Sequence, residues 1–155
     1  MGKYLKINCD GGARGNPGPA ASSFVVYERR LHGLATDTTD TDRDAWILRY
    51  KCGKFLGVKT NNEAEYAAVI EALLYLINSI KSINSINSIN LFLDSNLVVN
   101  QINGIFKVKE PRLRELLVKV RELEGQIKVP ITYFYMPREQ NKEADELVNQ
   151  TLDKN

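Results

Sequence analysis

The sequence has little net charge, almost no cysteine and no long apolar run. Lys and Arg total 21 and Asp and Glu total 19, so the net charge of +2 is too small to indicate nucleic-acid binding on its own. No stretch approaches the roughly 18 apolar residues of a membrane span, and the first residues lack the apolar run of a signal peptide. We therefore expect an intracellular, cytoplasmic protein that makes no membrane contact.

The two cysteines, Cys9 and Cys52, are too few for a disulfide framework and have no metal-ligand spacing. Cys9 belongs to a predicted strand, where it is expected to be a small buried apolar side chain. This cysteine usage is typical of a protein in a reducing compartment. A hydrophobic content of 43% is sufficient for a core, and the chain length favours a single domain over residues 1–155.

The spacing of apolar residues predicts the order β-β-β-α-β-α-α-β-α. The strands are expected at residues 3–10, 20–30, 45–52, 89–94 and 130–135. The helices are expected to begin near residues 60, 95, 111 and 140–141, the first of them with a capping box formed by Thr60 and Glu63. Three antiparallel strands, followed by strands joined through helices, give an α/β mixed sheet with helices on its faces.

Two segments do not fit this pattern. Residues 36–44 hold four aspartates and no apolar side chain. They lack the Gly and the terminal Glu of a calcium-binding EF-hand loop, so a solvated hairpin tip is expected. Residues 77–90 carry isoleucine at every third position, with Asn, Ser or Lys between. A period of three fits neither a helix nor a strand, and we expect this repeat to lengthen the end of the first helix or the loop after it.

Four acidic residues recur where a predicted element begins or ends. Asp10 and Asp94 close the first and fourth strands, Glu65 lies in the first turn of the first helix, and Asp145 lies early in the last helix. The first and fourth strands are natural neighbours at the centre of the sheet, so their two acids can lie side by side. Clustered carboxylates repel unless a cation lies among them. Their oxygen ligands suit Mg²⁺ or Mn²⁺, and two such ions about 4 Å apart are used in phosphodiester chemistry.

Each acid also has a structural explanation when it is taken alone. Asp10 precedes a glycine-rich turn, Glu65 can favour the helix dipole, and Asp94 can cap the next helix. Asp145 can be an exposed surface residue. The four acids together, on a topology that can bring them to one edge of the sheet, favour a two-metal site for a phosphate-containing substrate.

Four sequence blocks resemble the four signature blocks of type 1 ribonuclease H, and they occur in the family's order. They are Asp10-Gly11-Gly12 with residues 15–18, then residues 60–66, 94–98 and 141–147. The resemblance covers roughly residues 3–152. It implies the ribonuclease H-like fold, a five-stranded mixed sheet in which strands 1–3 form an antiparallel meander and strands 4 and 5 run parallel to strand 1. The stretches 101–104 with 107–109, and 137–145, are most similar to archaeal and short bacterial members.

The resemblance implies a metal-dependent endonuclease that hydrolyses the RNA strand of RNA/DNA hybrids and leaves 5′-phosphate and 3′-hydroxyl ends. The catalytic and metal-binding residues it implies, for two Mg²⁺ or Mn²⁺ ions, are Asp10, Glu65, Asp94 and Asp145. The implied substrate-binding residues are Gly11, Asn16, Thr60, Asn61, Asn62 and Asn96. An Asn amide both donates and accepts hydrogen bonds, as recognition of a ribose 2′-hydroxyl requires. The capping box alone also explains Thr60. A monomer without an obligatory protein partner is expected.

The sequence departs from the family pattern at three places. Well-studied members carry a histidine in the loop before the last helix, but residues 136–140 have none, and the only histidine is His32. Arg138, Glu139 or solvent are therefore the candidates for proton transfer. The basic protrusion of many members is absent, leaving a cluster of Lys107, Lys109, Arg112 and Arg114, and Asn96 stands where glutamine is commoner.

Two alternative functions have distinguishable features. A non-catalytic nucleic-acid-binding or assembly module with this fold is expected to lose acids, whereas all four are present. Relatives of other two-metal nucleotidyl transferases, such as integrases, share the strand-borne acids. The helix entry at residues 60–62 and the set of asparagines argue against that second alternative.

Overall fold

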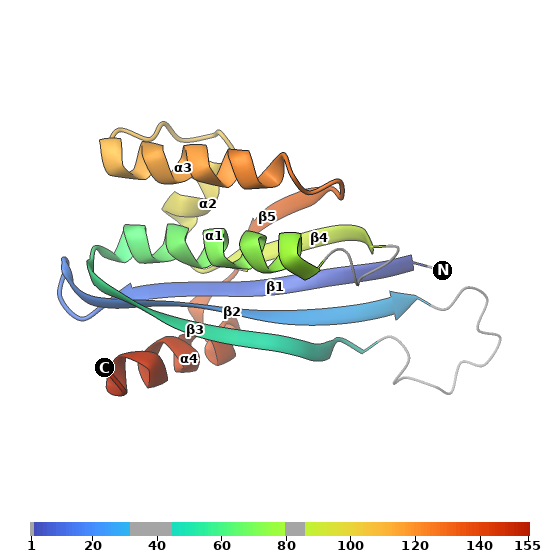
Figure 1. Ribbon diagram of the computed structural model, residues 1–155, viewed down its shortest axis with the longest axis horizontal. Helices are drawn as coiled ribbons and strands as arrows, with labels where there is room; N and C mark the ends of the chain where they lie inside the picture. Colours follow the sequence, from blue (N-terminus) through green and yellow to red (C-terminus); the bar gives the residue numbers. More distant parts are fainter. Residues whose placement is uncertain (1, 32–44, 80–85) are drawn as a thin grey trace.

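The computed structural model describes residues 2–31, 45–79 and 86–155 (Figure 1). The predicted hairpin tip at residues 36–44 and His32 lie outside the described residues. None of the described helices is both long and apolar enough to span a membrane.

A five-stranded mixed sheet forms the centre of the molecule, in the order β3-β2-β1-β4-β5 (Figure 1). Strand β1 pairs antiparallel with β2, β2 pairs antiparallel with β3, β4 is parallel to β1, and β5 is parallel to β4. This topology confirms the predicted meander and mixed sheet. The strands are β1 (Gly2–Ala13), β2 (Gly18–Leu31), β3 (Ile47–Lys59), β4 (Ile86–Leu93) and β5 (Ile131–Tyr135).

Helices cover both faces of the sheet, as predicted (Figure 1). Helices α1 and α3 are stacked above one face with α2 beside them, and α4 lies against the other face. A short 3-10 helix, η2, precedes α4. The helices are α1 (Asn61–Ser79), α2 (Asn96–Ile102), α3 (Pro111–Glu124), η2 (Arg138–Gln140) and α4 (Lys142–Asp153).

The main core lies between the sheet and α1. Alternate residues of β1 point into it, and Leu5, Ile7 and Cys9 are all almost fully buried. Helix α1 presents Tyr66, Val69, Leu73 and Leu76 to the same core. Fully burying a large apolar side chain stabilises a fold by about 1.5–3 kcal/mol, so this contact fixes the distance between α1 and β1.

The start of α1 is fixed by the predicted capping box. The Thr60 backbone N–H donates to Glu63 Oε1 at 3.1 Å, and the Glu63 N–H donates to Thr60 Oγ1 at 3.2 Å. Two otherwise unpaired backbone donors are thereby satisfied. Because α1 begins at Asn61, Glu65 lies just after the first turn rather than within it.

The sequence predicted that the first strand ends at Asp10, but β1 continues to Ala13. Residues 11–13 continue to pair with β2, up to Ala13 opposite Ala20, so the strand continues on that side. Pairing with β4 on the other side ends at Asn8 and Phe92. At Asp10, β1 is therefore still paired with β2 but no longer with β4, and this leaves space for a site on the β4 side of Asp10.

Strand β3 continues to Lys59 instead of ending at Cys52. The glycines at 53 and 57 weaken the prediction of a strand from the sequence. Gly53 is nevertheless required by packing. A Cβ atom at Gly53 would lie 2.3 Å from Thr151 Oγ1 of α4. The glycine therefore allows α4 to approach the edge strand.

The isoleucine repeat is divided between two elements. Ile77 belongs to α1, whereas Ile86 and Ile89 belong to β4, and residues 80–85 lie outside the described residues. The expectation that the repeat only lengthens the helix or its loop is therefore wrong for its last part. Strand β4 begins at Ile86 rather than at Ile89, because Ile86 and Ser88 already pair with Lys3 and Tyr4 of β1, across a register shift.

Candidate active site

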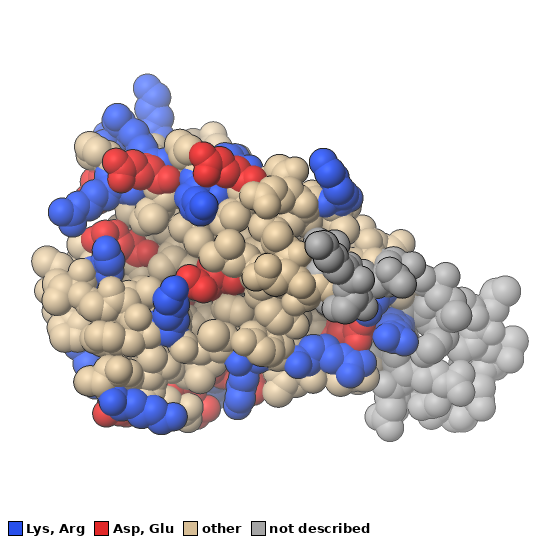
Figure 2. Space-filling model, viewed as in Figure 1, with Lys and Arg blue, Asp and Glu red and all other residues tan. Residues whose placement is uncertain are grey.

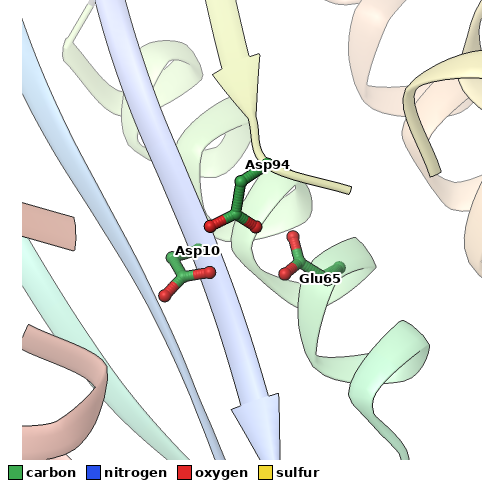
Figure 3. A group of neighbouring side chains, drawn as sticks. All are labelled: Asp10, Glu65 and Asp94. Carbon is green, nitrogen blue, oxygen red and sulfur yellow. The ribbon is translucent and has the colours of Figure 1, made fainter. Parts of the chain in front are cut away.

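Three acidic side chains from three elements point toward one another (Figure 3). Asp10 comes from β1, Glu65 from α1, and Asp94 directly follows β4. One carboxylate oxygen of each residue lies within 4.8 Å of the others. Asp10 and Glu65 are only 5% and 6% exposed, so two of the three acids are buried in the protein.

The parallel pairing of β1 and β4 brings Asp10 and Asp94 together. Both strands run in the same direction, so their carboxyl ends meet at one edge of the sheet, as the sequence predicted. Gly11 brings Glu65 to the same place. A Cβ atom at Gly11 would lie 2.2 Å from the Ala64 backbone carbon, so only glycine lets α1 approach β1 this closely. This packing role of Gly11 was not predicted.

Asp145 lies on the same pocket but outside the close group of three. It is half-buried in the first turn of α4, and Arg138 Nη2 lies 3.3 Å from its Oδ1 atom. The pocket has a volume of about 440 Å³ and is lined by all four acids, together with Gly11, Asn61 and Arg138. The structure thus places the four predicted acids around one cavity.

Burial and mutual repulsion shift these acids toward their protonated forms. Burial, followed by the charges of Asp94 and Asp145, raises the pKa of Asp10 to about 7. Burial, followed by the charges of Asp10 and Asp94, raises the pKa of Glu65 well above its usual range. Burial also raises the pKa of Asp94, although the neighbouring Arg138 guanidinium opposes this shift. The protein alone therefore does not compensate the negative charge of this site.

The donor set fits a divalent cation. Glu65 Oε2 is buried and has no hydrogen-bond partner among the described residues. An unpaired carboxylate oxygen beside two further carboxylates is costly without a counter-ion. Hard oxygen ligands in this number suit Mg²⁺ or Mn²⁺.

Asn141 belongs to the site, although no role was predicted for it from the sequence. Its side-chain Nδ2 donates to the Cys9 backbone carbonyl at 2.8 Å. A hydrogen bond from Asn141 also lowers the pKa of Asp94. Asn141 occupies the N-cap position of α4 but makes no capping hydrogen bond, because its side chain turns toward the sheet. An Asn before a helix is normally interpreted as a cap, and that interpretation hides this role.

Two of the predicted substrate-binding asparagines connect the turn after β1 to the start of α1. The Asn61 backbone N–H donates to Asn16 Oδ1, and the Ala13 N–H donates to Asn61 Oδ1, both at 2.9 Å. These bonds position the pocket wall that Asn61 forms. They also give Asn16 a structural explanation.

The other two predicted asparagines do not line the pocket of the acids, and one of them, Asn62, lines a second pocket of about 530 Å³ near the loop between α2 and α3. Asn62 lines this pocket with Leu97, Phe106 and Lys107. Asn96 is exposed, and its Oδ1 accepts a hydrogen bond from Asn100 at 3.0 Å. Lys and Arg side chains gather over the same loop and the start of α3 (Figure 2), the region of the predicted basic cluster.

Comparisons with known sequences cover nearly the whole chain. A family model described as reverse transcriptase-like matches residues 8–151. The chain is 36% identical to Ribonuclease HI of Halobacterium salinarum over 145 residues, which are 93% of this chain and 62% of that protein. It is 35% identical over 147 residues to the bifunctional protein Rv2228c of Mycobacterium tuberculosis, covering 95% of this chain and 35% of that protein. The chain thus spans only part of the length of these relatives.

Solved structures with the same fold match nearly the whole chain. LC11-RNase H1, isolated from compost and solved in complex with an RNA/DNA hybrid, has a TM-score of 0.79 at 33% identity, over 97% of both chains. RNase H1 from the halophilic archaeon Halobacterium salinarum has a TM-score of 0.78 at 32% identity, over 98% of this chain and 99% of that one. Together with the four acids around one pocket, these similarities show that the chain belongs to the type 1 ribonuclease H family.

Proposed function

We propose that this protein is a metal-dependent endonuclease that hydrolyses the RNA strand of RNA/DNA hybrids. The observation that carries the proposal is the convergence of Asp10, Glu65 and Asp94 within 4.8 Å, with Asp145 on the same pocket. The similarity to proteins named ribonuclease HI and RNase H1, one of them solved with a hybrid, supports the substrate class.

The four acids would hold two Mg²⁺ or Mn²⁺ ions. When bound, such ions activate a water and stabilise the leaving oxygen in phosphodiester hydrolysis. The chain supplies the rigidity that this chemistry needs, because each acid comes from a different and well-packed element. Hydrolysis in this manner leaves a 5′-phosphate and a 3′-hydroxyl.

Arg138 supplies positive charge to the site but does not donate the proton to the leaving oxygen. Its guanidinium contacts Asp145 and counteracts the rise in the pKa of Asp94. An Arg side chain stays protonated in proteins, so it is unsuited to proton transfer at neutral pH. The pocket is open to solvent, and we assign protonation of the leaving oxygen to water. Arg138 then positions Asp145 and the phosphate.

Recognition of the RNA strand would come from amide and backbone groups around the pocket. Asn61 lines the pocket and is exposed, so its amide can reach a ribose. Gly12 and Ala13 bring backbone to the same wall. Contacts of this kind with the 2′-hydroxyl distinguish RNA from DNA and carry little sequence information. We therefore expect hybrid-specific, sequence-tolerant cleavage.

The experiment is a cleavage assay on end-labelled RNA/DNA hybrid, single-stranded RNA and duplex DNA, with Mg²⁺, Mn²⁺ or EDTA. The proposal predicts cleavage of the RNA strand of the hybrid only, dependent on metal, with 5′-phosphate and 3′-hydroxyl products. The Glu65→Gln variant should lose more than about 100-fold of the activity, because buried charged groups at a reacting centre contribute on this scale.

The matched control is Glu122→Gln, which neutralises an exposed acid of α3 outside the pocket and should retain activity. Absence of metal-dependent hybrid cleavage by the unmodified protein would refute the proposal. It would favour a non-catalytic module of the same fold.

A further inference from the structure

The sheet face that carries α4 is covered by this helix at one end only (Figure 1). Ser23 Oγ donates to the Ala144 carbonyl of α4 at 2.6 Å, and the Tyr27 hydroxyl donates to Glu143 of the same helix. Residues 23 and 27 of β2 therefore face α4. Beyond Tyr27, toward the amino end of β1, no described helix covers this face.

Strand register places the neighbouring side chains on the same uncovered part. Lys6 lies opposite Tyr27, and Tyr4 lies opposite Arg29 in the β1–β2 pair. Asn90 of β4 is aligned with Lys6 on the other side of β1. Side chains alternate along a strand, so these residues share one face, opposite the core residues of β1.

A pocket of about 240 Å³ lies on this uncovered part, lined by Tyr4, Arg29, Trp46 and Asn90. Its walls are two aromatic rings, one guanidinium and one amide that both donates and accepts hydrogen bonds. Pockets for drug-sized ligands usually measure about 300–1,000 Å³, so this one suits a single flat ring system.

The charged side chains that the structure describes on this surface are cationic and lie next to aromatic rings. The Lys6 ammonium lies 4.9 Å from the ring centroid of Tyr27 and 4.9 Å from that of Trp46. The Arg29 guanidinium carbon lies 6.0 Å from the Trp46 centroid. Among the described residues, Lys6 makes no ion pair with a carboxylate. A ligand that brings both negative charge and flat rings complements this composition.

The same face continues toward the candidate active site. Phe92 follows Asn90 by two residues and stacks on Phe134 of β5, with ring centroids 5.3 Å apart. Asp94 follows Phe92 by two residues at the end of the strand, and on β1 the same alternation leads from Lys6 to Asp10. A chain lying on this face would therefore lead to the acids.

We propose that this face binds single-stranded nucleic acid, with one base in the pocket between Tyr4 and Trp46 and the backbone near Lys6 and Arg29. Proteins that bind single strands combine a basic track with aromatic rings on which bases stack. Asn90 can form hydrogen bonds with the edge of the enclosed base. The pocket, rings and cations carry this proposal; only the continuity with the acids rests on the proposed function.

Trp46 is the only tryptophan in the chain and therefore reports on this surface alone. Intrinsic fluorescence is recorded in EDTA while an unlabelled oligothymidylate of about 12 nucleotides, a length typical of single-strand sites, is added. We expect saturable quenching of the emission. Binding at the pocket of the acids, or at the loop before α3, would raise the anisotropy of a labelled oligonucleotide without quenching Trp46.

Variants then locate the binding by anisotropy of the labelled oligonucleotide. Trp46→Ala and Lys6→Gln should each weaken binding, the former by about 5- to 100-fold, as expected for loss of one stacked base. The matched control is Tyr50→Ala, which removes an exposed ring of β3, four residues after Trp46 but on the opposite face of the sheet, where Tyr50 stacks on Tyr75. It should bind like the unmodified protein, and circular dichroism should show all three variants folded.

Three results would overturn the proposal. They are unchanged Trp46 emission at saturating oligonucleotide, equal affinities for Lys6→Gln and Tyr50→Ala, and equal quenching by polyglutamate of the same length, which would indicate charge alone. The Asp10→Asn variant separates the two proposals. It should lose hybrid cleavage and keep the quenching, so either function can fail without the other.

Discussion

The Asn141 side chain donates a hydrogen bond to the Cys9 backbone carbonyl at 2.8 Å, and this bond ties the start of α4 to the strand that carries Asp10. Asn141 is 1% exposed, so the bond is shielded from water. Asp145 lies in the next turn of the chain, on α4. This amide therefore helps to position the fourth acid relative to the other three, together with the hydrogen bond from Ser23 Oγ to the Ala144 carbonyl.

Replacing Asn141 by Ala should destabilise the protein and reduce its activity. A buried carbonyl left without its donor costs about 1–3 kcal/mol, and loss of a residue that orients metal ligands costs about 10- to 100-fold in activity. Urea denaturation and hybrid cleavage measure the two effects. The control is Asn155→Ala, which removes an exposed amide-to-backbone bond and should change neither. Equal results for the two variants would show that Asn141 does not position the site.

The metal-free protein should lose stability as the pH rises. The pKa of Asp10 is about 7 in the folded protein, against a usual value of 3.8. A raised pKa means that the folded state binds the proton more tightly, so its stabilising effect is full below pH 4 and is lost as the pH rises through 7. Thermal unfolding in EDTA at pH 5 and pH 8 measures this loss.

The Asp10→Asn variant should remove that part of the pH dependence and melt higher than the unmodified protein at pH 8 in EDTA. Each kcal/mol corresponds to about 2–4 °C in a chain of this size. In saturating Mg²⁺ the unmodified protein should melt higher than Asp10→Asn, because ligand binding stabilises only the protein that holds the ion. A variant that melts lower than the unmodified protein in EDTA at pH 8 would contradict the electrostatic account of the site.

Two adjacent glycines offer a test of how α1 positions Glu65. A Cβ atom at Gly11 would overlap the α1 backbone at 2.2 Å, whereas at Gly12 the nearest atom is Val148 Cγ1 at 3.7 Å. Gly11→Ala should cost about 1–3 kcal/mol, as overpacking does. Displacing Glu65 by about 1 Å can reduce the rate about 100-fold. Gly12→Ala should keep the stability of the unmodified protein in urea denaturation, and comparable losses of stability in both variants would refute the packing role of Gly11.

Removal of Arg138 should move the acid limb of the pH–rate profile to higher pH. The guanidinium lowers the pKa of Asp94, so the Arg138→Ala variant should need a higher pH to ionise that acid. Hybrid cleavage across pH 5–9 at saturating metal measures the shift. Lys128→Ala, which removes an exposed charge in the loop after α3, should leave the profile in place. An unshifted profile for Arg138→Ala would show that Asp94 does not sense this charge.

Local signals in the sequence predicted the elements that depend on local chemistry. The capping box of Thr60 and Glu63 predicted the start of α1 to within one residue. The apolar residues of the first and fourth strands predicted two buried strands that pair at the centre of the sheet, as β1 and β4 do. The four acids were found because each stands near the end of an element. The pocket confirms that they share one location.

The parts that were missed depend on tertiary contacts. Gly11 and Gly53 are required where a helix approaches the sheet, which a single strand's pattern does not reveal. Asn141 lies at a helix start, where local chemistry predicts a cap, yet its amide reaches a strand 132 residues away in the sequence. Pairing with β1 and burial of Ile89 in the core, not the spacing of the isoleucines, decide that the end of the repeat is a strand.

The central claim is that these acids hold divalent ions at the phosphate to be cleaved. Anomalous diffraction from crystals grown with Mn²⁺ and an uncleavable RNA/DNA hybrid tests it most directly. The account predicts two Mn²⁺ peaks about 4 Å apart, contacted by Asp10, Glu65, Asp94 and Asp145, beside an RNA phosphate. A hybrid bound elsewhere, or bound at the pocket without Mn²⁺ among these acids, would contradict it.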